Sequence, residues 1–201
     1  MGRDVGPGDA DLLASAAAGD GDAFAAFYRR HVGAVTGLAV RLGVTPDDVA
    51  DTVSETFIVA LDRAESYVPQ LDSARPWLLG IAWRVAQHGF RRRVRQARLQ
   101  RRVGGRLPRF TDDEAEAVAA AVDAARLTSE LEAAVGRLSR SEREVFELVA
   151  QAGLTPAEVA IALGISGNAA RVRLSRARRR LRRHAVTDGR IAAIDVRENE
   201  A

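Results

Sequence analysis

The segment from Leu154 to Ala185 constrains the fold of this chain more than any other, because it follows the pattern of a helix-turn-helix. Thr155 is a suitable N-cap, proline fills the first helical position, and Glu158 stands three residues after the cap, the spacing of a capping box. Gly164 provides a sharp turn, and Ser166 is placed to cap a second helix. We therefore expect two helices joined by a tight turn.

The second helix of this motif has one apolar face and one basic face. Its apolar positions recur with helical spacing at Ala170, Leu174, Ala177 and Leu181. The opposite face carries Asn168, Val172, Ser175, Arg176, Arg179 and Arg183. Residues 166–185 contain eight arginines and no acidic residue. The alternative is a basic helix whose arginines serve only to keep the surface in contact with water. The helix cap, the glycine turn and the placement of the charge on one face together favour a recognition helix in a DNA major groove.

Charge is distributed unevenly along the chain, although the formal net charge is only +3. Residues 76–109 hold ten arginines and no acid, which makes them a second strongly basic block beside 166–185. Acidic residues predominate in the segments before each block, 1–75 and 110–165. Basic blocks of this kind favour nucleic acid through phosphate neutralisation and counterion release. The acidic segments suit a basic partner.

Composition favours an all-α protein: 47% of the residues are apolar, only 5% are aromatic, and no long strand-like alternation occurs. Cysteine is absent, so disulfides and thiolate chemistry are excluded, and the three histidines form no ligand set. We expect no catalytic residues, no metal and no cofactor. No apolar run approaches membrane-spanning length and the N-terminus lacks the apolar core of a signal peptide, so a cytoplasmic protein without membrane insertion is expected.

The N-terminal part predicts several helices, beginning at Asp11 after a flexible tail, with dense apolar faces typical of a core. A helix that follows Thr45 and Pro46 buries one side and presents a polar side. The polar side carries Asp48, Asp51, Ser54, Glu55 and Asp62. These carboxylates lack a histidine or a second cluster at ligand spacing, so we interpret them as a solvated or docking surface and not as a metal or acid–base site.

A helix over roughly residues 73–95 is the second informative segment. Trp77, Leu78, Ile81, Ala82 and Val85 form its predicted buried face. Trp83 lies off that face, near Gln87 and Phe90, with Arg84 and Arg91 at the margin. Aromatic, amide and arginine side chains together suit unstacked bases held against a basic surface. Packing of Trp83 and Phe90 against other helices is the equally weighted alternative.

The sequence predicts two small helical domains joined by a flexible linker. The boundaries are a tail at 1–10, a first domain at 11–95, a linker at 96–126, a second domain at 127–185 and a C-terminal tail at 186–201. Gly104, Gly105 and Pro108 exclude one continuous helix through the linker.

Two motifs resemble the extracytoplasmic-function (ECF, group IV) sigma factors of bacterial RNA polymerase, in the sigma-70 family. DDVADTVSETFIVAL followed by RPWLLGIAWRVAQHGFRRR is similar to sigma region 2. LSRSEREVFELVAQAGLTPAEVAIALGISGNAARVRLSRARRRL is similar to sigma region 4. Their order and separation match as well, over about residues 22–185.

The resemblance implies a transcription initiation factor with two DNA contacts and one polymerase contact. Docking on the clamp helices of the polymerase β′ subunit is implied for Asp48, Asp51, Ser54 and Glu55. Capture of the −10 strand is implied for the loop 67–74 and for Trp83, Arg84, Gln87, His88, Arg91 and Arg92. Reading of the −35 duplex is implied for Asn168, Arg171, Val172, Arg173, Ser175, Arg176 and Arg179, in a domain that also rests on the β flap. Many members of the family are held inactive by an anti-sigma factor.

The sequence departs from the usual family residues at several of these positions. Ser54 and Leu61 stand where Gln and Trp are usual, Arg84 stands where Asn is common, and Ala169 and Ala170 replace larger residues. The departures bear on promoter sequence and on individual docking contacts. A stand-alone helix-turn-helix regulator is the alternative function, and it predicts palindromic DNA binding without polymerase. An enzyme with a DNA-binding tail is disfavoured, because the chain shows no nucleophile, metal set or phosphate loop.

Overall fold

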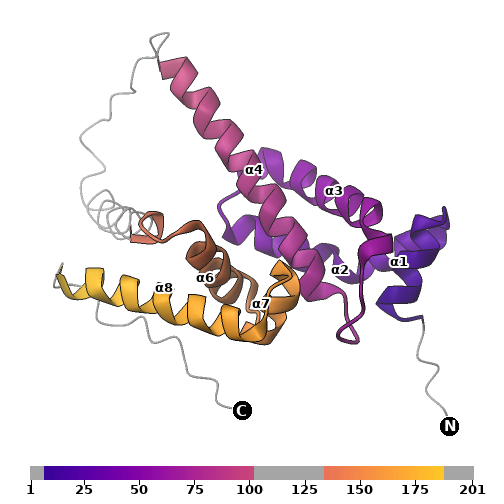
Figure 1. Cartoon of the computed structure of the whole chain (residues 1–201). Helices are drawn as coiled ribbons and strands as arrows, with labels where there is room; N and C mark the ends of the chain where they lie inside the picture. Colours follow the sequence, from indigo (N-terminus) through magenta and orange to yellow (C-terminus); the bar gives the residue numbers. More distant parts are fainter. Residues whose placement is uncertain (1–6, 102–133, 188–201) are drawn as a thin grey trace, which may run out of the picture. The chain divides into compact units, whose positions relative to one another are not determined.

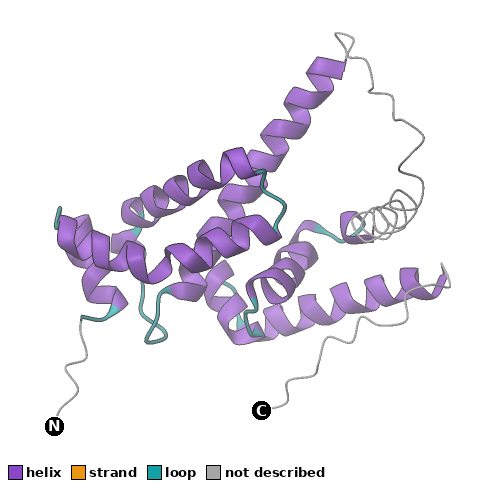
Figure 2. Ribbon diagram, turned by 180° about the vertical axis from the view of Figure 1, so that it is seen from behind, coloured by secondary structure: helices purple, strands orange, loops and turns teal. Residues whose placement is uncertain are grey.

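The computed structural model describes residues 7–101 and 134–187, with side chains described for 7–90 and 134–183. Every regular element within these ranges is a helix, as the sequence predicted (Figure 2). By their contacts the described residues form two compact units, one made of 7–101 with 147–170 and the other of 134–146 with 171–187. Most of the predicted linker and of the C-terminal tail lies outside the described residues.

The first unit is built around a long helix. Its elements are α1 (Asp9–Ala17), α2 (Gly21–Arg41), α3 (Pro46–Asp62), η1 (Ala64–Ser66), α4 (Arg75–Arg101), the end of α6 (Arg140–Ala152) and α7 (Pro156–Leu163). Helix α4 contacts α2, α3 and α7, so it is central to the unit (Figure 1). It continues to Arg101, six residues beyond the predicted boundary of the first domain.

The core between α2, α3 and α4 follows the predicted apolar faces. Phe27 of α2 and Phe57 of α3 are buried and meet edge to face, with ring centroids 6.1 Å apart. Leu78 and Ile81 of α4 are also buried. Each such side chain contributes about 1.5–3 kcal/mol relative to exposure. The predicted core residue Trp77 is only half-buried and packs its ring against Tyr67, with centroids 4.9 Å apart.

A buried carboxylate connects α1, α2 and the start of α4. Asp9 opens α1, inside the segment predicted as a tail, and it is 2% exposed. Its Oδ1 accepts from the Arg30 guanidinium at 2.6 Å, and its Oδ2 accepts from His31 Nε2 at 2.8 Å, Ser73 Oγ at 3.0 Å and Ala74 N at 2.8 Å. The carboxylate therefore anchors the N-terminus of α4.

The second unit contains the start of α6 and most of α8 (Gly167–Thr187). Leu138, Ala177 and Leu181 form its buried cluster, with Phe146 packed against it. Glu142 is buried at the start of α6, where its carboxylate accepts from the Ser139 backbone at 3.0 Å and pairs with Arg180 at 3.0 Å. Burial raises the pKa of Glu142, but the hydrogen bonds from Ser139 and the charge of Arg180 outweigh it and hold the pKa below its usual value.

Candidate nucleic-acid interface

The helix-turn-helix has the local geometry that its sequence predicted. Thr155 caps α7: its Oγ1 accepts from the Glu158 backbone N–H at 3.3 Å, while the Glu158 carboxylate accepts from the Thr155 N–H at 2.8 Å. Gly164 ends α7 in the left-handed region, with φ of 66°. Ser166 Oγ then accepts from the Ala169 N–H at 3.1 Å at the start of α8. These bonds fix where each helix begins and ends.

Helix α8 buries one face and exposes the other. Ala170, Leu174, Ala177 and Leu181 are at most 5% exposed, in agreement with the predicted apolar stripe. The predicted opposite face is exposed at Asn168, Val172, Ser175, Arg176, Arg179 and Arg183. Arg171 is exposed beside that face, and Arg173 is half-buried. The exposed face therefore combines polar side chains that can form hydrogen bonds, near the helix start, with arginines along its length.

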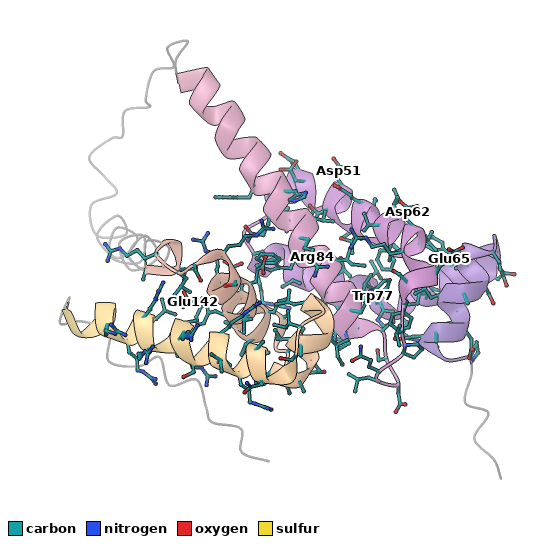
Figure 3. The ribbon with its side chains drawn as sticks, viewed as in Figure 1. Asp51, Asp62, Glu65, Trp77, Arg84 and Glu142 are labelled. Atoms are coloured by element: carbon teal, nitrogen blue, oxygen red, sulfur yellow. The ribbon has the colours of Figure 1, made fainter. Side chains whose placement is uncertain are left out.

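The polar side of α3 is an exposed acidic surface. Asp51, Ser54, Glu55 and Asp62 are exposed, and Asp48 is half-buried (Figure 3 labels Asp51 and Asp62). Ile58 lies among them with 59% of its surface exposed. An exposed apolar side chain surrounded by carboxylates is complementary to a protein surface that has an apolar centre surrounded by basic residues. We name Asp48, Asp51, Ser54, Glu55, Ile58 and Asp62 the acidic α3 surface.

The loop between η1 and α4 is open to solvent and carries apolar side chains. Val68 is 67% exposed and Leu71 is 45% exposed, on either side of Pro69. Tyr67 packs against Trp77, and burial raises the pKa of the Tyr67 hydroxyl above its usual value.

Trp83 is buried, which favours the packing alternative of the two that the sequence left open for it. It is 2% exposed, and its indole Nε1 donates to Glu147 Oε2 at 2.6 Å. Gln87, one turn later, donates to the same carboxylate oxygen at 3.0 Å. The periodicity correctly separated Trp83 and Gln87 from the core face, but Glu147 of α6 binds both side chains and α7 packs against α4.

The remaining predicted −10 residues of α4 differ in their surroundings. Arg84 is half-buried and donates to the Ala162 carbonyl of α7 at 3.3 Å, whereas His88 is exposed. Phe90 is 54% exposed, so the packing alternative does not hold for it. Arg91 and Arg92 belong to α4, but their side chains lie outside the described residues.

Neither a metal cluster nor a membrane span occurs in the part of the chain that the structure describes. No group of three or more histidine, cysteine, aspartate or glutamate side chains lies close enough there to hold an ion. No described helix is both long and apolar enough to cross a bilayer.

Comparison with known proteins identifies both halves. The family model for sigma-70 region 2 matches residues 27–96, and that for sigma-70 region 4 matches residues 128–181. RNA polymerase sigma factor CnrH of Cupriavidus metallidurans is 33% identical over 186 residues, covering 88% of this chain and 95% of CnrH. ECF RNA polymerase sigma factor SigK of a Mycobacterium species is 30% identical, over 74% of this chain and 75% of SigK. This chain is an ECF sigma factor.

A solved structure supports the same membership. The structure of CnrH in complex with the cytosolic domain of CnrY superimposes with a TM-score of 0.56 at 30% identity, covering 91% of this chain and 99% of that one. The acidic α3 surface, the loop and α4 up to residue 96 fall within the region 2 match of this sigma factor, and the helix-turn-helix up to residue 181 falls within its region 4 match.

Sequence reasoning missed three residues that organise this sigma factor. Asp9 was assigned to a tail because its partners are distant in sequence, although a histidine on the apolar face of α2 signals a buried polar partner. No signal in the sequence singles out Gly80. In the structure a Cβ at this position would stand 2.3 Å from the Ala162 carbonyl oxygen, so glycine is what permits the close approach of α7. Glu147, which accepts from Trp83 and Gln87, carries no local sequence signal.

Proposed function

We propose that this sigma factor directs RNA polymerase to promoters by reading a −35 element with α8 and capturing a −10 strand with the α4 side of the first unit. The exposed basic face of α8 carries the proposal. A helix that is capped at Ser166 and exposes Asn168, Arg171 and Arg176 presents hydrogen-bonding groups suited to base edges. The later arginines, including Arg179, suit phosphate contacts that set the register.

The acidic α3 surface is the proposed contact with the clamp helices of the β′ subunit. Its exposed carboxylates and Ile58 suit a basic partner surface, and they lie on one helix of the region 2 match. Ser54 and Leu61 have smaller side chains than the Gln and Trp that are usual at these positions in the family. The proposed contact with the clamp helices therefore depends more on Asp51 and Glu55 in this protein. The region 4 half is proposed to rest on the β flap.

The −10 contact is proposed to involve the loop around Val68 and Leu71, followed by the α4 residues Trp83, Arg84, Gln87, His88, Arg91 and Arg92. The exposed apolar side chains of the loop suit unstacked bases. Arg84 replaces the usual Asn in this face, so we expect a −10 preference different from that of relatives with Asn.

The protein is proposed to act in the cytoplasm, where RNA polymerase acts, as a non-catalytic specificity subunit. A regulatory protein partner is part of the proposal, because the relative CnrH was solved in complex with the cytosolic domain of CnrY.

Run-off transcription with purified core polymerase tests the proposal. Start sites that appear only when the protein is added, on a library of genomic fragments, are the expected result. Aligning those sites then yields both promoter elements. Duplex binding by the free protein at palindromic sites, without any association with core polymerase, would instead support the stand-alone regulator.

A further inference from the structure

The loop between η1 and α4 exposes a run of side chains, although its two ends are held in place. Residues 68–73 are all exposed, whereas Tyr67 before them is half-buried and Ala74 after them is fully buried. The exposed run includes Val68 and Leu71, which are proposed to meet unstacked bases. Because a loop binds more tightly when it is already fixed in its binding arrangement, what holds its two ends matters for capture of the strand.

Helix α1 contacts both ends of this loop. It packs against η1, which leads into the loop, and through Asp9 it binds the residues that lead out of the loop into α4. The Asp9 Oδ2 atom accepts from Ser73 Oγ at 3.0 Å and from the Ala74 N–H at 2.8 Å. At the base of the loop, Tyr67 packs against Trp77 of α4, with ring centroids 4.9 Å apart (Figure 3 labels Trp77). The loop is therefore fixed at its entry by an aromatic contact and at its exit by a carboxylate.

Helix α2 holds the Asp9 carboxylate in one orientation. The Arg30 guanidinium donates to Oδ1 at 2.6 Å, and His31 Nε2 donates to Oδ2 at 2.8 Å. His31 is itself buried, and its ring packs against Phe27 with centroids 4.8 Å apart. Burial raises the pKa of Asp9, but the hydrogen bonds from Ala74 and Arg30 outweigh it and hold the pKa below its usual value. The loop exit is therefore bound by an ionised carboxylate whose direction is set by α2.

The contact between Asp9 and the loop can be weakened without removing Asp9 from the core. Loss of the Ser73 hydroxyl removes one bond at the loop exit and leaves the three other hydrogen bonds of Asp9, from Arg30, His31 and Ala74, in place. Ser73 is exposed, so its truncation opens no cavity in the core. A change at Ser73 therefore acts on the loop and leaves the packing of α1 against α2 intact.

We propose that Asp9 is a positioning residue for capture of the −10 strand. This inference rests on the proposed function, because it assigns a part in strand capture to a buried residue that does not itself touch DNA. Asp9 fixes the loop exit through Ser73 and Ala74, so that Val68 and Leu71 are in place before the strand arrives. Without this contact the loop samples other arrangements, and the strand must order it at the expense of affinity.

Hydrogen exchange of the full chain tests the fixing of the loop without DNA or polymerase. In Ser73→Ala, the peptide that covers residues 67–74 is expected to exchange faster than in the parent, while peptides from α2 and α3 exchange at parental rates. Ser73→Thr keeps a hydroxyl and is expected to restore slow exchange. Ser66→Ala is the matched control, because exposed Ser66 donates to the Arg63 carbonyl at 2.8 Å, just before the loop, instead of to Asp9. The control is expected to exchange like the parent over 67–74.

Binding of a −10 non-template oligonucleotide to the assembled holoenzyme connects the loop to function. A loop that is correctly arranged about a tenth of the time binds about tenfold more weakly, so Ser73→Ala is expected to lose about tenfold in affinity, measured by fluorescence anisotropy. Ser73→Thr is expected to regain it. The oligonucleotide is taken from the mapped start sites, with a scrambled strand as control. Binding of a −35 duplex is expected to stay at the parental value in both variants, because α8 takes no part in the contact with Asp9.

Asp9→Ala separates this contact from the cap that Ser73 provides to α4. Ser73 Oγ also accepts from the Arg75 N–H at 3.2 Å, so Ser73→Ala removes that bond as well as the one to Asp9. Asp9→Ala keeps the cap and is expected to weaken strand binding at least as much, at a temperature where circular dichroism shows the variant to be folded. Because Asp9 is buried, its loss reaches the strand only through the loop. Glu144→Ala is its control, since Glu144 also pairs with an arginine, Arg140 at 3.2 Å, but belongs to the second unit.

Two results would overturn the positioning role while polymerase-dependent transcription still upheld the proposed function. One is a strand affinity that stays at the parental value in both Ser73→Ala and Asp9→Ala. The other is faster exchange in Ser73→Ala that spreads through α2 and α3, which would mean a general loss of stability instead of a released loop. Absence of polymerase-dependent transcription would remove the proposed function itself, and the strand-binding role of the loop with it, whatever the exchange of residues 67–74.

Discussion

Replacing Asp9 with alanine is expected to destabilise the first unit by about 3 kcal/mol. The carboxylate is 2% exposed and accepts four hydrogen bonds that connect α1, α2 and the start of α4. Two of the donors, His31 Nε2 and the Ala74 N–H, are buried and would lose a partner, at about 1–3 kcal/mol each. Arg30 is 43% exposed at its side chain, so its guanidinium can return to water at little cost.

Urea unfolding followed by tryptophan fluorescence measures this loss. Both tryptophans lie on α4, so the signal reports the first unit. Asp11→Ala is the control, because Asp11 is an exposed acid on the same helix, and it is expected to change stability by no more than about 0.5 kcal/mol. An Asp9→Ala midpoint equal to that of the control would refute the reasoning, since it would mean that the buried donors find other partners.

Three further predictions concern pH, DNA and polymerase. Burial lowers the pKa of His31 despite the nearby Asp9 carboxylate, so the folded state favours the neutral imidazole. The free energy of unfolding should therefore fall as the pH drops below about 6.5, the usual pKa of histidine. In urea titrations at a series of pH values, His31→Gln should reduce this dependence on pH. Arg176→Ala should weaken binding to a −35 duplex by about 1–3 kcal/mol in fluorescence anisotropy, and an effect equal on scrambled duplex would argue against base contact. Asp51→Arg should weaken association with core polymerase in a pull-down while leaving −35 duplex binding intact; equal loss of both would indicate misfolding.

The fold was predictable where the signals are local. Thr155 and Glu158 lie within one helical turn of each other, and Gly164 ends the same short helix, so the capping box and the turn could be inferred from spacing alone, and the structure confirms them. The exposed face of α8 follows from helical periodicity in the same way. The predicted domain boundaries remain a prediction, although α4 extends to Arg101, into the segment assigned to the linker.

The residues that the sequence left open or missed depend on contacts between distant parts of the chain. Periodicity showed that Trp83 lies off the core face, but it does not report what covers that face, and Glu147 is 64 residues away in sequence. Asp9 reaches His31 across 22 residues and Ser73 across 64, so nothing near Asp9 marks it as buried. Gly80 has an ordinary helical environment in sequence, and only the approach of α7 explains why glycine is needed there.

Run-off transcription with purified core polymerase is the most direct test of the central claim, that this sigma factor selects promoters through α8 and the first unit. The account predicts new start sites that depend on the protein, with a common −35 element whose use is lost in Arg176→Ala and retained in Glu144→Ala. Start sites that are unchanged when the protein is added, or that do not share upstream elements, would contradict it.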